Sequence, residues 1–110
     1  MKTQFDVWEF DFPEKGRHPV VLISHPDICA RAEFVNGLFC TSQRQSRGIK
    51  DHEVLLNGAD GLDWETFCNC ATIYLLDSSK LLRHRGRVSL ERRREIRAKI
   101  RDVFRLAATD

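Results

Sequence analysis

Short apolar runs separated by turn-forming residues fill the first 76 positions of the chain. Phe5–Phe12 is rich in aromatic residues that partly alternate with acids, and it ends in the turn-forming segment Pro13–Gly16. Pro19–Ser24 is short and almost continuously apolar, which is typical of a strand buried on both faces. We therefore predict a first strand with an exit loop, then a strand at the centre of a sheet. A polar connection containing Asp27 and Arg31 follows them.

Three more segments have strand character. Phe34–Cys40 is a candidate third strand, in which Gly37 indicates a bulge or a close backbone approach. His52–Leu56 resumes the pattern and ends at Asn57–Gly61, a strong turn signal. Trp64–Leu76 is rich in β-branched, aromatic and cysteine residues, as long strands are. The first 76 residues are thus predicted to be all β.

The C-terminal segment changes to helical periodicity. Ser89 is a good N-cap, Glu91 suits the first turn, and apolar residues recur at helical spacing, which predicts a helix from about Leu90 to Leu106. Five or six short strands and one helix cannot form two large sheets. We therefore expect a mainly β fold, a small and strongly bent barrel with the C-terminal α-helix packed on it. A length of 110 residues fits a single domain, residues 1–110.

The net charge of +2 is an average of two unlike parts. Residues 1–79 hold seven Lys or Arg against twelve Asp or Glu, giving −5, whereas residues 80–110 hold eleven against four, giving +7. Such a basic tail favours an anionic partner, either nucleic acid or an acidic protein segment. The alternative is a solvated helix face that packs on the barrel, with some arginines meeting acids of the first part. If the tail binds RNA, replacing Arg93, Arg97 and Arg101 should flatten the salt dependence of affinity.

Several classes of protein are disfavoured by the sequence. No apolar run approaches the roughly 18–20 residues of a membrane span, and the first residues lack the pattern of a signal peptide, so we expect a cytoplasmic protein without membrane contact. The four cysteines are then expected to be reduced, and most of them buried as small apolar residues. They lack paired C-x-x-C spacing, and with no metal or nucleotide motif we expect neither a metal nor a cofactor.

Two polar segments carry candidate chemistry. Gly16–Pro19 offers the Arg17 guanidinium, which can hold a phosphate, beside the His18 imidazole, which suits proton transfer near neutral pH. Thr41–Arg47 offers hydroxyls, amides and two guanidiniums. Together they suit RNA cleavage, in which the 2′-OH loses a proton, the 5′ oxygen gains one and charge builds on the phosphate. The alternatives are structural: a loop histidine before a proline, and hydroxyls that hydrogen-bond at a strand end.

Short motifs in a fixed order add a resemblance to a known family. They are D-F-P (Asp11–Pro13), G-x-x-P-V-V-L (Gly16–Leu22), C-T-S-Q (Cys40–Gln43), an R-R-G-x-V-like stretch (Arg85–Val88) and I-x-x-K-I (Ile96–Ile100). The sequence thereby resembles the PemK/MazF toxins of toxin-antitoxin modules over nearly its whole length. The resemblance implies a homodimeric, SH3-like barrel that cleaves single-stranded RNA without metal and inhibits growth. It also implies an acidic antitoxin that covers the same groove.

The family's functional positions transfer only in part. The resemblance places the family's threonine at Thr41, but the arginine that precedes the proline falls on His18, with Arg17 one residue earlier. Because neighbours on a strand point to opposite faces, Arg17 can substitute for that arginine only if this segment is a loop. An acidic position of the family falls at Cys70–Thr72, around Ala71, where this chain has no acid. We expect catalytic roles for Arg17, His18 and Thr41, and RNA binding by Ser42, Gln43, Arg44 and Arg47. The alternative is a catalytically silent barrel that binds an acidic antitoxin or nucleic acid.

Overall fold

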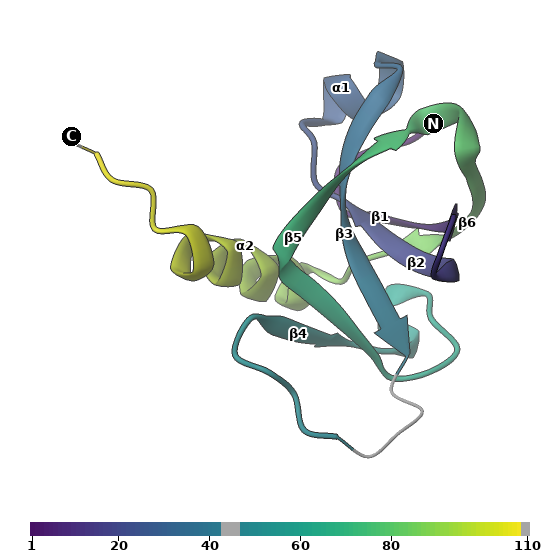
Figure 1. Ribbon diagram of the computed structural model, residues 1–110. Coiled ribbons are helices and arrows are strands. Elements are labelled where there is room, and N and C mark those ends of the chain that lie inside the picture. Colours follow the sequence, from purple (N-terminus) through teal and green to yellow (C-terminus); the bar gives the residue numbers. More distant parts are fainter. Residues whose placement is uncertain (43–46, 109–110) are drawn as a thin grey trace.

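The computed structural model describes residues 1–42 and 47–108 and has six strands, two α-helices and two 3-10 turns. In chain order the elements are β1 (Asp6–Phe12), β2 (Gly16–Leu22), α1 (Pro26–Arg31), β3 (Phe34–Ser42), β4 (Glu53–Leu56), η1 (Gly58–Asp60), β5 (Thr66–Asp77), η2 (Ser78–Lys80), β6 (Leu81–Arg87) and α2 (Leu90–Phe104). The strands form one curved sheet, and α2 lies beside β4 and β5 (Figure 1). The predicted mainly β fold with a C-terminal helix is confirmed.

The sheet is antiparallel, with the strand order β4-β5-β3-β2-β1-β6. β2 pairs with β1 and β3, and its residues Val20, Val21 and Leu22 are fully buried, as predicted for a central strand. Because side chains alternate between faces, Val21 belongs to the core that includes Ile96 of α2, whereas Val20 and Leu22 belong to the core that includes Cys29 of α1. The sheet therefore carries a core on each face.

The predicted SH3-like barrel remains a prediction, because β4 and β6 are the two edges of the sheet and do not pair in the described parts of the chain. The sheet is nevertheless strongly bent at β5, which changes direction midway along its length (Figure 1). Leu38 pairs with Ile73 and Cys40 with Cys68, so β5 carries three more residues than β3 between these pairs. Such an insertion bends a strand and increases its twist.

Two elements differ from the sequence prediction. The prediction that the first 76 residues are all β is wrong at α1, where the segment interpreted as a polar connection forms a short helix. Pro26 begins this helix, His25 Nδ1 accepts a hydrogen bond from the Asp27 amide at 3.1 Å, and Cys29 is buried. Six residues are too few to show helical periodicity. β6 was not predicted either, because its alternating arginines were attributed to a basic tail.

The C-terminal helix follows the prediction except at its end. Ser89 is the N-cap, and Arg105 adopts a left-handed conformation with φ of 38° that ends the helix at Phe104 rather than Leu106. All four cysteines have free and buried thiols, as expected for small apolar residues. Across residues 1–42 and 47–108, no helix has the length and apolar character needed to cross a membrane.

Candidate active site

A pocket of about 460 Å³ lies where β1, β2, the end of β3 and the start of β5 meet β6. Its walls are formed by Glu9, Arg17, His18, Pro19, Thr41, Ser42, Leu62, Asp63, Trp64, Thr66 and Arg85. The two polar segments singled out in the sequence are thus brought together, although they are more than twenty positions apart. Each of the described residues predicted for this site lines the pocket, except Arg47.

Arg17 and His18 lie within β2 rather than in a loop, so their side chains point to opposite faces of the sheet, and the loop that would let Arg17 take the place of His18 is not present. Arg17 shares a face with Glu9, and its Nη1 lies 3.9 Å from Glu9 Oε2. The Arg17 side chain stays 68% exposed, which leaves most of its donors directed at solvent. Arg17 is therefore well placed to bind an incoming phosphate.

The His18 ring points into an aromatic cluster on the other face. Its centroid lies 4.6 Å from that of Phe39, and it also makes an edge contact with Phe12. Its Nδ1 lies 3.2 Å from the carbonyl oxygen of Cys40, and its Nε2 lies 2.9 Å from that of Lys15. Both ring nitrogens thus face backbone acceptors, and a neutral imidazole can donate to only one of them. This ring connects the β1–β2 turn to the residue that precedes Thr41.

Thr41 and Ser42 are the last two residues of β3 and are partly buried. Thr41 pairs with Phe67 and Ser42 with Thr66, so pairing with β5 fixes the backbone position of both residues at the pocket. Their hydroxyls are placed on a paired strand, which holds reacting groups more firmly than a loop does. The next residues predicted to bind RNA, Gln43 and Arg44, lie outside the described residues.

Arg85 is a pocket residue that the sequence analysis missed. Val7 pairs with Gly86 and Trp8 with His84, so Arg85 is an extra residue in β6 between these two pairs. A bulge of this kind re-aims a side chain. The Arg85 side chain is only 12% exposed, and its Nη1 donates to Glu9 Oε1 at 2.9 Å while its Nη2 donates to Asp63 Oδ2 at 2.8 Å. The sequence signal for this bulge is the Arg85–Gly86 dipeptide, because a glycine within a strand often marks a bulge.

Glu9 is the second residue that was missed. Its carboxylate is 14% exposed and lies between the guanidiniums of Arg17 and Arg85. From the sequence, Glu9 was interpreted only as one of the acids that alternate with aromatic residues in the first strand. Only the pairing of β1 with both β2 and β6 brings the two arginines to it.

Another part of the pocket wall is the segment from Leu62 to Trp64, and the buried carboxylate of Asp60 fixes the turn before it. Asp60 is fully buried, and it accepts hydrogen bonds from the amides of Asn57 at 2.9 Å and Ser89 at 2.8 Å. Gly61 has φ of +89°, and a Cβ at this position would lie 2.5 Å from the carbonyl oxygen of Arg85. This close approach connects the segment to β6 and bridges the open side of the sheet.

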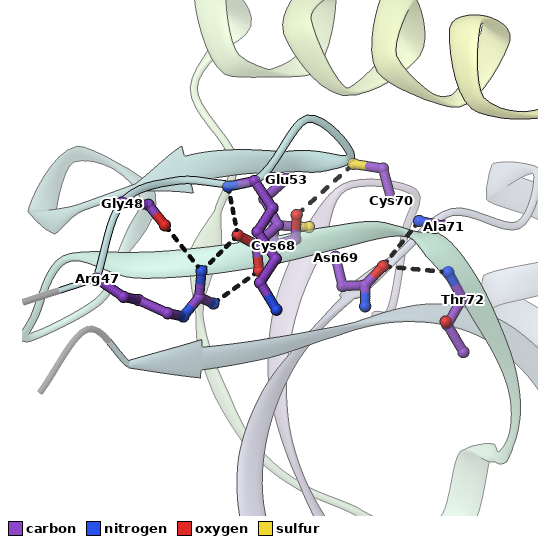
Figure 2. A network of polar contacts seen from close by, with 9 residues as sticks. Arg47, Gly48, Glu53, Cys68, Asn69, Cys70, Ala71 and Thr72 are labelled. Atoms are coloured by element: carbon purple, nitrogen blue, oxygen red, sulfur yellow. Dashed lines mark hydrogen bonds and ion pairs between the residues drawn. The ribbon is translucent and has the colours of Figure 1, made fainter. Parts of the chain in front are cut away.

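Arg47, the remaining residue predicted to bind RNA, lies outside the pocket wall and pairs with Glu53 (Figure 2). Its two terminal nitrogens each donate to one Glu53 oxygen at 2.8 Å, and its guanidinium lies 4.1 Å from the Phe67 ring centroid. The hydrogen bonds from Arg47 and from the Lys50 amide outweigh burial and lower the pKa of Glu53. The same pairing raises the pKa of Arg47.

The position at which the resemblance implies an acid, Cys70–Thr72, lies in the bend of β5. There Asn69 Oδ1 accepts hydrogen bonds from the amides of Ala71 at 2.8 Å and Thr72 at 3.2 Å (Figure 2). Neither Ala71 nor Thr72 lines the pocket. A carboxylate is nonetheless present at the pocket, because Glu9 supplies one from β1.

No group of three or more His, Cys, Asp or Glu side chains is arranged to hold a metal ion in the portion of the chain that is described. What the pocket does offer is a pair of guanidiniums, a pair of carboxylates and the hydroxyls of Thr41, Ser42 and Thr66. Such a set can bind a phosphate and exchange a proton.

This fold is shared with toxins of toxin-antitoxin systems. An endoribonuclease from a Mycobacterial species, solved with its cognate antitoxin, matches with a TM-score of 0.81 and 18% identity over 97% of this chain and 98% of that one. The Mycobacterium tuberculosis toxin MazF-mt6 matches with a TM-score of 0.78 and 15% identity over 93% and 98%. A MazE-MazF structure from Deinococcus radiodurans matches with a TM-score of 0.75 and 16% identity over 96% of both chains. At such identities these likenesses establish the fold alone.

The family itself is shown by the sequence. The family model of PemK-like, MazF-like toxins of type II toxin-antitoxin systems matches residues 3–104. The chain belongs to the PemK/MazF toxin family, as the motif order indicated. No curated protein matches the sequence significantly.

Proposed function

We propose that this protein is the toxin of a toxin-antitoxin module and acts as an endoribonuclease on single-stranded RNA in the cytoplasm, without a metal ion. The observation that carries the proposal is the convergence of Arg17, Arg85, Glu9 and Thr41 on one pocket. The structural neighbours described as endoribonucleases support it at the level of the family. An unpaired strand is the favoured substrate, because only a flexible strand can present one nucleotide to a pocket of about 460 Å³.

The proposed reaction needs only side chains of the pocket and one water molecule. Glu9 takes the proton from the 2′-OH, and the 2′ oxygen attacks the neighbouring phosphorus. The bond from phosphorus to the 5′ oxygen then breaks, which leaves a cyclic 2′,3′-phosphate, and the departing 5′ oxygen takes a proton from water to become a hydroxyl. The hydroxide formed from that water takes the proton held by Glu9, which returns to its ionised form. Arg17 and the Thr41 hydroxyl stabilise the charge on the phosphate oxygens, while Arg85 fixes the position of Glu9.

His18 has a positioning role in this proposal, rather than the proton transfer suggested by the sequence. Its ring nitrogens face the carbonyl oxygens of Lys15 and Cys40, so it holds the β1–β2 turn beside Thr41. Ser42, at the pocket wall, contacts the RNA backbone together with Gln43 and Arg44, which follow it in the chain.

The proposal includes protein partners. The solved structures of toxins with antitoxins support an antitoxin as partner. We propose that this antitoxin is acidic, because an acidic segment would compete with RNA for the exposed Arg17. We also propose a homodimer, and the exposed apolar side chains of Ile73 and Leu75 on β5 offer a contact for a second copy. Sedimentation at micromolar concentration tests this, since a monomer contradicts it.

Expression in a bacterium tests the proposed function. Wild-type protein should arrest growth and fragment cellular RNA, whereas Thr41→Ala should do neither at the same protein level. Harmless expression of both would contradict the toxin assignment. Growth arrest with intact RNA would instead support the alternative of a catalytically silent protein that acts by binding.

A further inference from the structure

Trp64 is an exposed aromatic residue at the wall of the pocket. It is one of the two tryptophans of the chain, it lines the pocket, and it is 65% exposed. Trp8, the other tryptophan, stacks on His84 with centroids 5.0 Å apart and contacts Asp6. Within residues 1–42 and 47–108, no ring and no cation stacks on the Trp64 indole. An indole is normally largely buried, so this exposure needs an explanation.

The backbone at Trp64 is anchored although its indole is exposed. Thr66 Oγ1 donates to the Trp64 carbonyl oxygen at 2.9 Å, and the Asp63 carboxylate on the other side accepts from Arg85 at 2.8 Å. Leu62, two residues before Trp64, is buried in the core. The indole is therefore presented from a fixed position, which reduces the entropy lost when a ligand stacks on it.

We propose that Trp64 is a stacking platform for an unpaired nucleobase next to the phosphate bound in the pocket. The inference rests on the proposed function and names the part of the substrate that the pocket wall recognises. Aromatic side chains stack on bases of single strands, and any base presents a suitable face. The exposed guanidinium of Arg17, on the same pocket wall, provides the charge that a nucleotide phosphate needs.

A nucleic acid fits this surface better than an apolar protein segment. An apolar segment laid on Trp64 would also cover Asp63, which is 73% exposed, and would remove its charge from water without a new partner. A nucleotide stacks on the indole with its base and keeps its charged phosphate at the exposed Arg17. A protein partner therefore becomes an outcome of the test rather than the expectation.

The first experiment is fluorescence of a Trp8→Phe variant, in which Trp64 is the single tryptophan. The probe is a short single-stranded RNA with a 2′-deoxy nucleotide at the cleavage position, which cannot be cut because it lacks the attacking hydroxyl. We expect the fluorescence of Trp64 to change in a saturable way as the probe is added. An unchanged signal, at concentrations where an independent assay shows binding, would overturn the proposal.

The second experiment measures affinity in variants. Trp64→Ala should weaken binding of the same probe by about 5- to 150-fold, the range for losing one stacked base, while Trp64→Phe should retain most of the affinity. Leu90→Ala is the control, because Leu90 is 69% exposed but lies on α2, outside the pocket wall. Equal affinity of Trp64→Ala and wild type would contradict the proposal.

A double-mutant cycle distinguishes stacking from a change in loop structure. Removing the base from the nucleotide that stacks should weaken binding to wild type but cost little further affinity in Trp64→Ala. The same penalty in both proteins, at every position of the probe, would overturn the proposal. A Trp64→Ala variant that loses only self-association or antitoxin binding would show a protein contact instead.

The proposed function and this inference can fail separately. If wild-type protein leaves single-stranded RNA intact and does not bind the probe, the proposed function fails. If wild type cleaves RNA and Trp64→Ala cleaves and binds equally well, the stacking role alone is wrong.

Discussion

Glu9 lies between the guanidiniums of Arg17 and Arg85, and this placement makes it the residue to change first. Glu9→Gln should lower the rate of RNA cleavage by about 10²- to 10⁴-fold, the usual contribution of a general base. The amide keeps the volume and accepts a hydrogen bond from Arg85, but it cannot take a proton. Initial rates on single-stranded RNA measure the effect. Glu33→Gln, which changes the same charge at an exposed residue away from the pocket, is the control.

The Arg47–Glu53 pair predicts how stability depends on pH. Since folding lowers the pKa of Glu53, the stabilisation is fully present above the unfolded value of about 4.3 and is lost as pH falls through the lower folded value. Glu53→Ala should cost about 1.5–3 kcal/mol near neutral pH, because it removes hydrogen bonds to a charged group. The difference from wild type should shrink below pH of about 4. Denaturant unfolding at several pH values measures this, and a difference independent of pH would contradict it.

The sequence was sufficient for some residues of the site and not for others. Arg17, Thr41 and Ser42 were predicted because their types and motifs indicate phosphate chemistry, and the structure places them at one pocket. Glu9 and Arg85 were missed, because their placement at the pocket depends on a contact between residues 76 positions apart. The bulge that directs Arg85 inward also breaks the alternation on which a strand prediction depends.

At the level of elements, Gly61 allows the segment after η1 to approach the edge strand β6 closely. In Gly61→Ala the new Cβ would meet the Arg85 carbonyl oxygen, and φ of +89° is unfavourable for alanine. We expect a loss of about 1–3 kcal/mol in the free energy of unfolding, and slower RNA cleavage because the pocket wall shifts. Thermal unfolding and cleavage rates measure both effects.

Gly58→Ala is the matched control for this prediction. Gly58 lies in the same turn, and a Cβ added there would meet nothing within 4 Å. Its stability should change little or rise slightly, because alanine restricts the unfolded chain. Equal stability of the two variants would contradict the bridging role of Gly61.

Elements were predicted where the local pattern identifies them, and they were missed where the element is very short or depends on a partner distant in sequence. The central strand was recognisable because Val20, Val21 and Leu22 form an apolar run that cores on both faces require. α1 is too short to show a period, and its residues gain stability from the cap of His25 and from burial of Cys29. β6 depends on pairing with β1, a partner far away in sequence that no local pattern reveals.

For the whole molecule, the function of the basic C-terminal part, residues 80–110, has to be explained beside the acidic first part, residues 1–79. α2 contributes no side chain to the pocket wall, and Arg93 Nε donates to the Val88 carbonyl oxygen at 2.7 Å. We therefore expect the helix mainly to pack. Replacing the exposed Arg94, Arg97 and Arg101 by glutamine should leave the salt dependence of binding to a pocket-sized RNA nearly unchanged. A slope reduced by about two, the value for three lost phosphate contacts on a single strand, would contradict this.

The most direct test of the account is cleavage of a labelled single-stranded RNA by the purified protein in excess chelator. The account predicts cleavage by wild type, and a rate reduced by about 10²-fold or more in Thr41→Ala, because the threonine hydroxyl then no longer stabilises the phosphate charge. Wild-type protein that leaves the RNA intact, or a Thr41→Ala variant that cuts as fast as wild type, would contradict it.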